Sequence, residues 1–332
     1  MSETATVIRP HADELHAAIT AMLGDGYAVS MRQPWEYYSS YPIEELEVQG
    51  EGQSARRILF KDLSPAAMLV DAQRAKMEFQ CDARREIEVY RKILSPNRLS
   101  TPDLVGAVCD QAANRYWLFL EKVEGAPLWQ VGDFSMWRAA AQWLAQFHNL
   151  LADRAESLVA PAHLLRYDGR ACRRWLDRAA RFADGADVPL LHRKAVCRIA
   201  DCGQVLADRI DALPTTVVHG EFYASNILVE RPDGAARIRP VDWEMAGVGP
   251  DLIDLAALTA GKWTAEQRDE MVAAYRAARD CQYSDLSVSL DVCRLYLAVH
   301  CVGCSPSWSP PKEHAFNWLG EAIRLAESLG FI

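Results

Sequence analysis

The change from strand-like to helix-like segments near residue 125 constrains this chain most. Before that point, short runs of alternating apolar, β-branched and aromatic residues are typical of strands. In the second hairpin strand Leu59 and Lys61 are expected on one face, and Ile58 and Phe60 on the other. The predicted elements of this part are, in order, a helix at about 10–23, a β-hairpin over 41–63, a helix over 82–94, and strands over 104–110 and 115–123.

The second part of the chain is mainly helical. Residues 135–152 place their apolar side chains on one stripe, as a helix packed against a core does. A strand pair interrupts the helices, with segments 215–230 and 236–247 around the turn Pro232-Asp233-Gly234. This order is that of the protein-kinase fold. We therefore expect an α+β chain with a small N-terminal antiparallel sheet and a larger helical C-terminal lobe.

Composition excludes several classes of protein. The 332 residues are 50% hydrophobic and 24% charged, which is typical of a folded chain with a large core. The net charge of −9 argues against nucleic acid and anionic membrane as partners, because both need a basic face. A cationic or neutral small partner fits the charge better. No signal pattern and no run approaching about 20 apolar residues is visible, so we expect a cytoplasmic protein.

The cysteines do not predict a disulfide framework. There are nine, an odd number, and they are scattered through apolar helical patterns, as reduced and buried thiols are. The one tight group is His300-Cys301-Val302-Gly303-Cys304. A structural zinc site usually needs a second ligand pair at matching spacing, and the sequence offers none. Metal binding by this group is therefore not expected.

Two short motifs carry the chemistry. The run His219-Gly220-Glu221-Phe222-Tyr223-Ala224-Ser225-Asn226 is followed by Val241-Asp242-Trp243-Glu244. At these residues the sequence resembles the aminoglycoside phosphotransferase and choline kinase superfamily. The catalytic loop of that superfamily is H-G-D-x-x-x-x-N, and its metal-binding Asp lies in an I/V-D-W/F/Y-E element. The resemblance implies a protein-kinase-like bilobal fold with lobes at 1–120 and 127–332 and a hinge at 121–126.

The resemblance also implies roles for these residues. Asn226 and Asp242 become the Mg²⁺ ligands, and their oxygen atoms suit a hard cation bound to nucleotide phosphates. Glu221 stands where the superfamily has its catalytic Asp, and we expect it to orient and deprotonate an alcohol. His219 is expected to brace the loop by hydrogen bonding.

The N-terminal half supplies candidates for binding ATP. Lys61 occupies the superfamily's phosphate-binding lysine position, with Glu86 as its expected partner and Glu88 as the competitor. The loop before the hairpin offers Ser39 and Ser40 as phosphate contacts, although the same two residues could simply form the turn.

The segment 117–125 resembles the hinge. Backbone N–H and C=O groups from Glu121 to Val123 would meet the adenine edge, and Phe119 or Leu120 would line the back of that pocket. A simple core strand has the same residues and stays open as an alternative. His148, in the following helix, is expected to have a structural role.

Two departures from the superfamily pattern matter. No G-x-G-x-x-G precedes Lys61, and the G-x-G at Gly50 and Gly52 lies in the hairpin turn. Glu221 keeps the carboxylate and the spacing to Asn226 but lengthens the side chain by a methylene. The phrase HGEFYASN is typical of an uncharacterised subset of the superfamily, and this chain resembles that subset over nearly its whole length. The resemblance implies that the glutamate is a trait of the subset.

The acceptor site is expected between the catalytic loop and the late helices. Glu244, Trp308 and Arg174 are candidate contacts, although Trp308 beside two prolines could instead anchor packing, and Arg174 belongs to an arginine run typical of a solvated helix face. Asp254 is expected to anchor the lobe, and Asp251 to start a helix.

These residues predict an ATP- and Mg²⁺-dependent O-phosphotransferase. Its acceptor would be a hydroxyl of a small metabolite such as an amino sugar, an aminoglycoside-like compound or an amino alcohol. The alternative is a degenerate kinase-fold protein that binds nucleotide or metabolite without turnover. The intact Lys61, Asn226 and Asp242 favour the enzyme.

Overall fold

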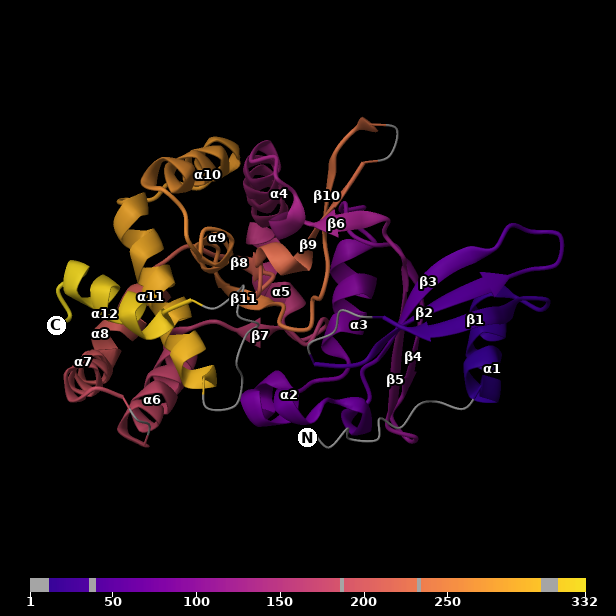
Figure 1. Cartoon of the computed structure of the whole chain (residues 1–332), viewed down its shortest axis with the longest axis horizontal. Coiled ribbons are helices and arrows are strands. Elements are labelled where there is room, and N and C mark those ends of the chain that lie inside the picture. Colours follow the sequence, from indigo (N-terminus) through magenta and orange to yellow (C-terminus); the bar gives the residue numbers. More distant parts are fainter. Residues whose placement is uncertain (1–11, 36–39, 186–187, 232–233, 306–315) are drawn as a thin grey trace. The chain divides into compact units, whose positions relative to one another are not determined.

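The computed structural model of the chain describes residues 12–35, 40–185, 188–231, 234–305 and 316–332 (Figure 1). The chain divides into two compact units, Met1–Glu124 and Gly125–Ile332. We call them the N-terminal and the C-terminal unit. The division lies within the segment 121–126 that resembles a hinge.

The N-terminal unit is a five-stranded antiparallel sheet with helices. The strand order is β1-β2-β3-β5-β4, and β2 and β3 are the predicted hairpin. The helix predicted over 82–94 begins at Arg85 and continues from α3 into a π-helical turn, Tyr90–Leu94. The elements are α1 (Ala12–Leu23), β1 (Ala28–Pro34), β2 (Ile43–Gln49), β3 (Arg56–Asp62), α2 (Val70–Ala75), α3 (Arg85–Val89), β4 (Leu104–Asp110) and β5 (Arg115–Glu121).

The two faces of this sheet have different partners, because side chains alternate along each strand. One face packs under α1, where Leu15 and Ile19 join Ile58, Phe60 and other strand residues in a buried apolar cluster. The next residue after Phe60, Lys61, points to the opposite face, where it meets α3. The predicted alternation of Ile58 and Phe60 against Lys61 is confirmed.

The C-terminal unit is mainly helical and holds two small three-stranded sheets, β10-β9-β6 and β7-β11-β8. Its helices are α4 (Ser135–Leu151), α5 (Ala155–Leu158), α6 (Gly169–Gly185), α7 (Leu190–Asp201), α8 (Gly203–Asp211), α9 (Leu252–Leu258), α10 (Ala265–Ala278), α11 (Leu286–Cys304) and α12 (Trp318–Ser328). Its strands are β6 (Gly125–Pro127), β7 (Leu165–Arg166), β8 (Thr215–Val218), β9 (Ile227–Glu230), β10 (Arg237–Pro240) and β11 (Gly247–Pro250).

Two strand pairs bring the sequence motifs together. β9 pairs with β10, and β8 pairs with β11, both antiparallel. The loop 219–226 connects β8 to β9, and the loop 241–246 connects β10 to β11. Because the strands on both sides of each loop are paired, the two loops lie at neighbouring strand ends, and we call them the catalytic loop and the acidic loop.

Helix α11 is the most apolar long helix of the part described here. Its 19 residues reach the length and hydropathy of a membrane span, which the sequence was not expected to contain. Within the fold 61% of this stretch is buried, and core helices of globular proteins meet the same criteria. α11 packs on α6, α9 and α12, next to one another in Figure 1.

Candidate active site

The catalytic loop begins with a backbone that only glycine fits. Gly220 has φ +85°. A Cβ atom there would lie 2.2 Å from the Tyr167 hydroxyl oxygen and 2.4 Å from the Met245 carbonyl oxygen. The Tyr167 hydroxyl itself donates to that carbonyl at 2.6 Å. The glycine therefore lets the catalytic loop approach the acidic loop closely.

A buried carboxylate holds this turn. Asp254, fully buried in α9, accepts the backbone N–H of His219 at 2.7 Å and that of Gly220 at 2.9 Å. His148 Nε2 lies 3.2 Å from the same carboxylate, and its Nδ1 lies 2.9 Å from the Tyr275 hydroxyl. Asp254 is thus the anchor that the sequence predicts, and His148 extends it by hydrogen bonding as well as packing.

Asp251 starts α9 but does not cap it with its side chain. Its carboxylate instead accepts Arg279 Nε at 2.8 Å and the Tyr283 hydroxyl. This buried ion pair fixes the segment after α10 to the start of α9.

His219 ties the two loops together. Its Nε2 donates to the Val241 carbonyl at 2.9 Å, directly before Asp242, and its Nδ1 accepts the Glu221 backbone N–H at 3.3 Å. Burial lowers the pKa of this imidazole, so it stays neutral. These hydrogen bonds hold the catalytic loop to the acidic loop, as expected of a bracing residue.

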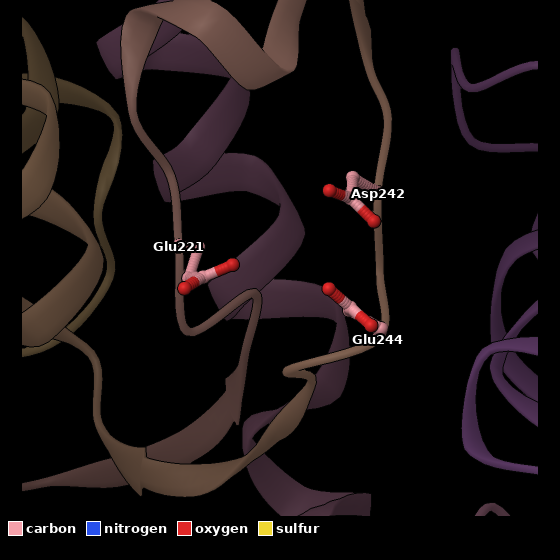
Figure 2. Close-up of side chains that lie close together, drawn as sticks. All are labelled: Glu221, Asp242 and Glu244. Atoms are coloured by element: carbon pink, nitrogen blue, oxygen red, sulfur yellow. The ribbon is translucent and has the colours of Figure 1, made fainter. Parts of the chain in front are cut away.

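Three carboxylates converge at these loops. Oxygen atoms of Glu221, Asp242 and Glu244 all lie within 4.8 Å of one another. Figure 2 shows Glu221 on one loop facing the two acids of the other. Between those two acids Trp243 is fully buried, with its ring 4.4 Å from the His219 ring and 5.2 Å from the Phe147 ring. We call these three acids the carboxylate cluster.

The backbone of Asp242 is left-handed, with φ +63°. Such a conformation costs of the order of 1 kcal/mol for a residue with a side chain, and Asp and Asn adopt it most readily. The strain lies at the residue that the resemblance assigns to the metal.

Asn226 is fixed to the loop that carries Glu221. Its Nδ2 donates to the Glu221 carbonyl at 3.0 Å. Its Oδ1 has a contact of 3.5 Å from the Ser225 hydroxyl, which leaves lone-pair capacity for a cation.

The donor set suits magnesium. Every candidate ligand atom is an oxygen from a carboxylate or an amide, as a hard cation prefers. Oxygen ligands at about 2.1 Å from Mg²⁺ lie at most about 4.2 Å apart, and the oxygen atoms of the cluster, all within 4.8 Å of one another, lie close to that range. Glu244 lies beside the candidate metal ligands and is 6% exposed. Its expected contact with the acceptor stays a prediction.

In the N-terminal unit, Lys61 forms a buried ion pair. Its Nζ lies 2.8 Å from Glu86 Oε2. The competitor Glu88 pairs with Arg91 at 3.0 Å. The pairing therefore agrees with the superfamily's spacing, and a phosphate-binding role for Lys61 stays a prediction.

The two candidates for the back of the nucleotide pocket, Phe119 and Leu120, lie on opposite faces of the sheet. Phe119 pairs with Phe60 and lies in the apolar cluster under α1, on the face opposite Lys61. Leu120 lies on the face of Lys61, since Leu118 is the direct partner of Lys61. Phe119 is therefore wrongly placed among the nucleotide contacts, and a nucleotide contact for the alternative, Leu120, stays a prediction.

One backbone N–H group of the segment that resembles a hinge already has a hydrogen-bond partner. The Glu121 N–H donates to the Asp103 carbonyl at 2.8 Å, so it is not available for adenine. Val123 is buried at the end of this unit, and its backbone stays a candidate for the adenine edge.

Four further candidates were named from the sequence. Ser39 and Trp308 lie outside the described residues. Ser40 is 5% exposed, and its carbonyl accepts the Leu69 N–H at 2.9 Å. Arg174 lies half-buried on α6.

The sequence did not predict that the end of α11 reaches the catalytic loop. The Tyr223 hydroxyl lies 3.9 Å from Cys301 Sγ, although the two residues are 78 positions apart. Burial raises the pKa of the Tyr223 phenol, to which Cys301 and Glu221 also contribute. The spacing of residues in the sequence does not show that Tyr223 contacts the Cys-x-x-Cys group.

Comparison with known proteins agrees with this fold. The sequence profile of the phosphotransferase enzyme family matches residues 45–287. Viomycin phosphotransferase from Streptomyces vinaceus is 40% identical over 70 residues, which are 19% of this chain and 24% of that protein. The match thus spans about a quarter of the length of that relative.

Solved structures share the fold over nearly their whole length. The microcompartment-associated aminopropanol kinase superposes with a TM-score of 0.61 at 16% identity, covering 96% of this chain and 95% of that one. The GDP complex of aminoglycoside 2′-phosphotransferase-IIIa has a TM-score of 0.60 at 13% identity, with 96% and 98% covered. The expected α+β kinase-like fold and the superfamily resemblance are confirmed. Because the profile spans most of its length, the chain belongs to the phosphotransferase enzyme family.

Proposed function

We propose that the protein is an ATP- and Mg²⁺-dependent O-phosphotransferase that acts on a hydroxyl group of a small molecule. The observation that carries the proposal is the carboxylate cluster on two loops braced by Asp254 and His219. Family membership and the Lys61–Glu86 ion pair support it. The related proteins named above phosphorylate small molecules, and one of them was solved with GDP bound.

The proposed roles follow from the chemistry of each side chain. Lys61 holds the α- and β-phosphates of the nucleotide, and Leu120 and the Val123 backbone contact its base. Asn226 and Asp242 hold Mg²⁺, joined by Glu244. When bound, the cation neutralises phosphate charge.

In the reaction, the acceptor oxygen bonds to the γ-phosphorus. The bond from that phosphorus to the bridging oxygen breaks, and the nucleoside diphosphate leaves with the electron pair. Glu221 accepts the proton of the acceptor hydroxyl, because its carboxylate is the member of the cluster that follows the HG turn. The protein contributes mainly position and charge, as phosphoryl transfer requires.

A two-stage experiment tests the proposal. Thermal shifts with ATP and GTP, each with and without Mg²⁺, measure nucleotide binding, and diphosphate release with a panel of alcohols measures transfer. We expect Mg²⁺-dependent binding and at least one accepted alcohol, with turnover lost in Asp242→Asn and kept in the exposed control Glu266→Gln. Mg²⁺-dependent binding without turnover on any acceptor would favour the degenerate alternative.

A further inference from the structure

The charged residues on either side of Val123 are joined to the sheet of the N-terminal unit by a ring of ion pairs. Lys122 Nζ lies 2.9 Å from Glu124 Oε1 and 3.5 Å from Glu45 Oε1 on β2. Arg57 of β3 closes the ring, since its guanidinium lies 3.3 Å from Glu45 and 2.6 Å from Glu124. Cations and carboxylates alternate around these four residues, which we call the hinge ring.

The inner half of the hinge ring is buried. The side chains of Lys122 and Glu45 are 7% and 3% exposed, whereas those of the other two members are 49% and 62% exposed. Gln33 of β1 donates to the second oxygen of Glu45 at 3.2 Å, and the Lys122 ammonium lies 5.3 Å from the centre of the Trp35 ring. Exposed ion pairs contribute little, but a buried charge that loses its partner is costly. The contact between Lys122 and Glu45 is therefore the one that holds the ring to the sheet.

The hinge ring lies on the same face of the sheet as Lys61. Glu45 pairs with Leu59, which lies two residues before Lys61 on β3. Side chains of directly paired residues, and of alternate residues along one strand, point to the same face. The ring is thus on the face proposed to bind nucleotide, opposite the apolar cluster under α1.

The chain is fixed on both sides of Val123. Before it, the Glu121 N–H donates to the Asp103 carbonyl at 2.8 Å, and the Glu121 carboxylate accepts the Asp103 N–H at 3.0 Å. Lys122 follows, and as a whole residue it is half-buried although its side chain is 7% exposed, so its backbone contributes to the exposure. After Val123, the side chain of Glu124 belongs to the hinge ring. The side chains of 122 and 124 therefore set the path of the backbone between them.

Val123 itself has backbone groups to offer. It is 8% exposed, and within the described parts of the chain neither its N–H nor its C=O has a hydrogen-bond partner. Buried backbone polar groups are nearly always paired in folded proteins. The two groups therefore suit the edge of a nucleotide base, which offers both donors and acceptors.

We propose that Lys122 is a positioning residue for the nucleotide, which acts through Glu45 and Glu124 to direct the Val123 backbone toward the edge of the base. This inference rests on the proposed function, because it names the side chain that orients a proposed base contact. Lys122 does not touch the reacting atoms in this role. Its loss should weaken nucleotide binding and leave the transfer step nearly unchanged.

Lys122→Met tests the role, because methionine is of similar length and carries no charge. We expect the Kd for nucleotide to rise at least about tenfold, and kcat at saturating nucleotide to stay within about threefold of wild type. Lys122→Arg restores a cation and should recover most of the affinity. If Lys122→Met does not fold, the double variant Lys122→Met/Glu45→Gln removes both buried charges and makes the same comparison. Wild-type affinity in the folded variant, or a fall in kcat without loss of affinity, overturns the proposal.

Arg115→Met is the matched control, at the opposite end of β5. Arg115 also combines an ion pair, with Glu14, and an aromatic contact, since its guanidinium lies 4.7 Å from the centre of the Trp117 ring. A purely structural role of Lys122 would give both variants the same effect. We expect Arg115→Met to keep the wild-type Kd for nucleotide even where its melting temperature falls. Equal losses of affinity in the two variants contradict the proposal.

A measurement without nucleotide reports on the backbone directly. Amide hydrogen exchange, read by mass spectrometry on peptides that cover 121–126, measures how firmly this segment is held. We expect faster exchange in Lys122→Met than in the wild type and in Lys122→Arg, whereas peptides that cover 104–110 should exchange alike in all three. Unchanged exchange over 121–126 in Lys122→Met overturns the inference.

The binding results separate this inference from the proposed function. If the wild type binds neither ATP nor GTP, the proposed function fails and the inference fails with it. If the wild type binds nucleotide and Lys122→Met binds it equally well, only the inference fails.

Discussion

The buried carboxylate of Asp254 accepts the backbone N–H of Gly220 at 2.9 Å and so fixes the turn directly before Glu221. The same carboxylate accepts the N–H of His219 at 2.7 Å. A buried side chain of α9 thereby sets the position of the loop that carries the proposed proton acceptor.

Asp254→Asn keeps the size of this side chain but turns one acceptor into a donor. One backbone N–H then loses its partner, so we expect a loss of about 2–4 kcal/mol in the free energy of unfolding. Urea unfolding measures it, and kcat should fall as well. Asp291→Asn on α11, which removes the pair with Arg294, is the control and should cost about 1 kcal/mol or less. Equal losses in the two variants would mean that Asp254 is no special anchor.

Gly220→Ala should destabilise the protein much more than the same substitution at a glycine with a similar φ. Gly234 has φ +82° with nothing within 4 Å of the place a Cβ atom would take, whereas Gly220 at φ +85° meets two oxygen atoms. Gly234→Ala should therefore cost about 1 kcal/mol for conformation alone. Gly220→Ala should cost roughly 2 kcal/mol more, because the loops must separate. Chemical unfolding of both variants measures the difference, and similar values would rule out the steric argument.

The Lys61–Glu86 pair allows stability and nucleotide binding to be separated. Lys61→Met leaves a buried carboxylate without its partner, and such a loss costs about 3–5 kcal/mol. The double variant Lys61→Met/Glu86→Leu should recover part of that stability but not the affinity for nucleotide. Thermal melts and nucleotide titrations measure the two effects.

The control for this pair is Lys92→Met, at an exposed lysine. Its melting temperature and its affinity for nucleotide should both stay near the wild-type values. If the double variant regains nucleotide affinity, Lys61 does not bind phosphate.

Glu221→Gln tests the proposed proton acceptor. The amide keeps the shape of the side chain but cannot accept the proton, so kcat should fall at least about 100-fold. The KM for nucleotide should change little, because nucleotide contacts are proposed for other residues. Steady-state kinetics with the accepted alcohol measures both constants. An unchanged kcat would remove Glu221 from the mechanism.

Acid should destabilise the fold through His300. Its pKa in the folded chain is about 4, below the ordinary value of 6.5. Above pH 6.5 the imidazole is neutral in both states and contributes no pH dependence. Between pH 6.5 and about 4 the unfolded chain binds a proton that the folded chain does not, so stability falls as the pH falls.

His300→Gln removes this titration while keeping a polar side chain. The melting temperature of the variant should therefore drop less between pH 7 and pH 4.5 than that of the wild type. His16→Gln, on the exposed face of α1, should follow the wild-type curve. Parallel curves for all three proteins would exclude His300 as the source.

Local sequence patterns predicted much of the fold. The hairpin of β2 and β3 was predictable because alternation along a strand is a local property, and Phe60 and Lys61 lie on the expected faces. Strand β1 was missed because most of its residues are exposed or only half-buried, so AVSMRQP shows no regular apolar alternation.

The sequence predicted those site residues that belong to a short motif. The loop 219–226 and the acid at 242 were identified from their resemblance to the superfamily motifs, and the sequence also suggested Asp254 as an anchor. The position of Glu244 in the carboxylate cluster depends on the acidic loop folding back toward Glu221. The contact between Tyr223 and Cys301 depends on helix packing, and neither can be read from a local pattern.

The left-handed backbone at Asp242 restricts which residues evolution can place there. Glycine and asparagine tolerate the same conformation, but glycine offers no side-chain oxygen. A glutamate could keep the charge only by adding to the backbone strain. Among the residues that adopt this backbone readily, only aspartate and asparagine also supply a side-chain oxygen, so the backbone and the proposed metal role restrict the position in the same direction.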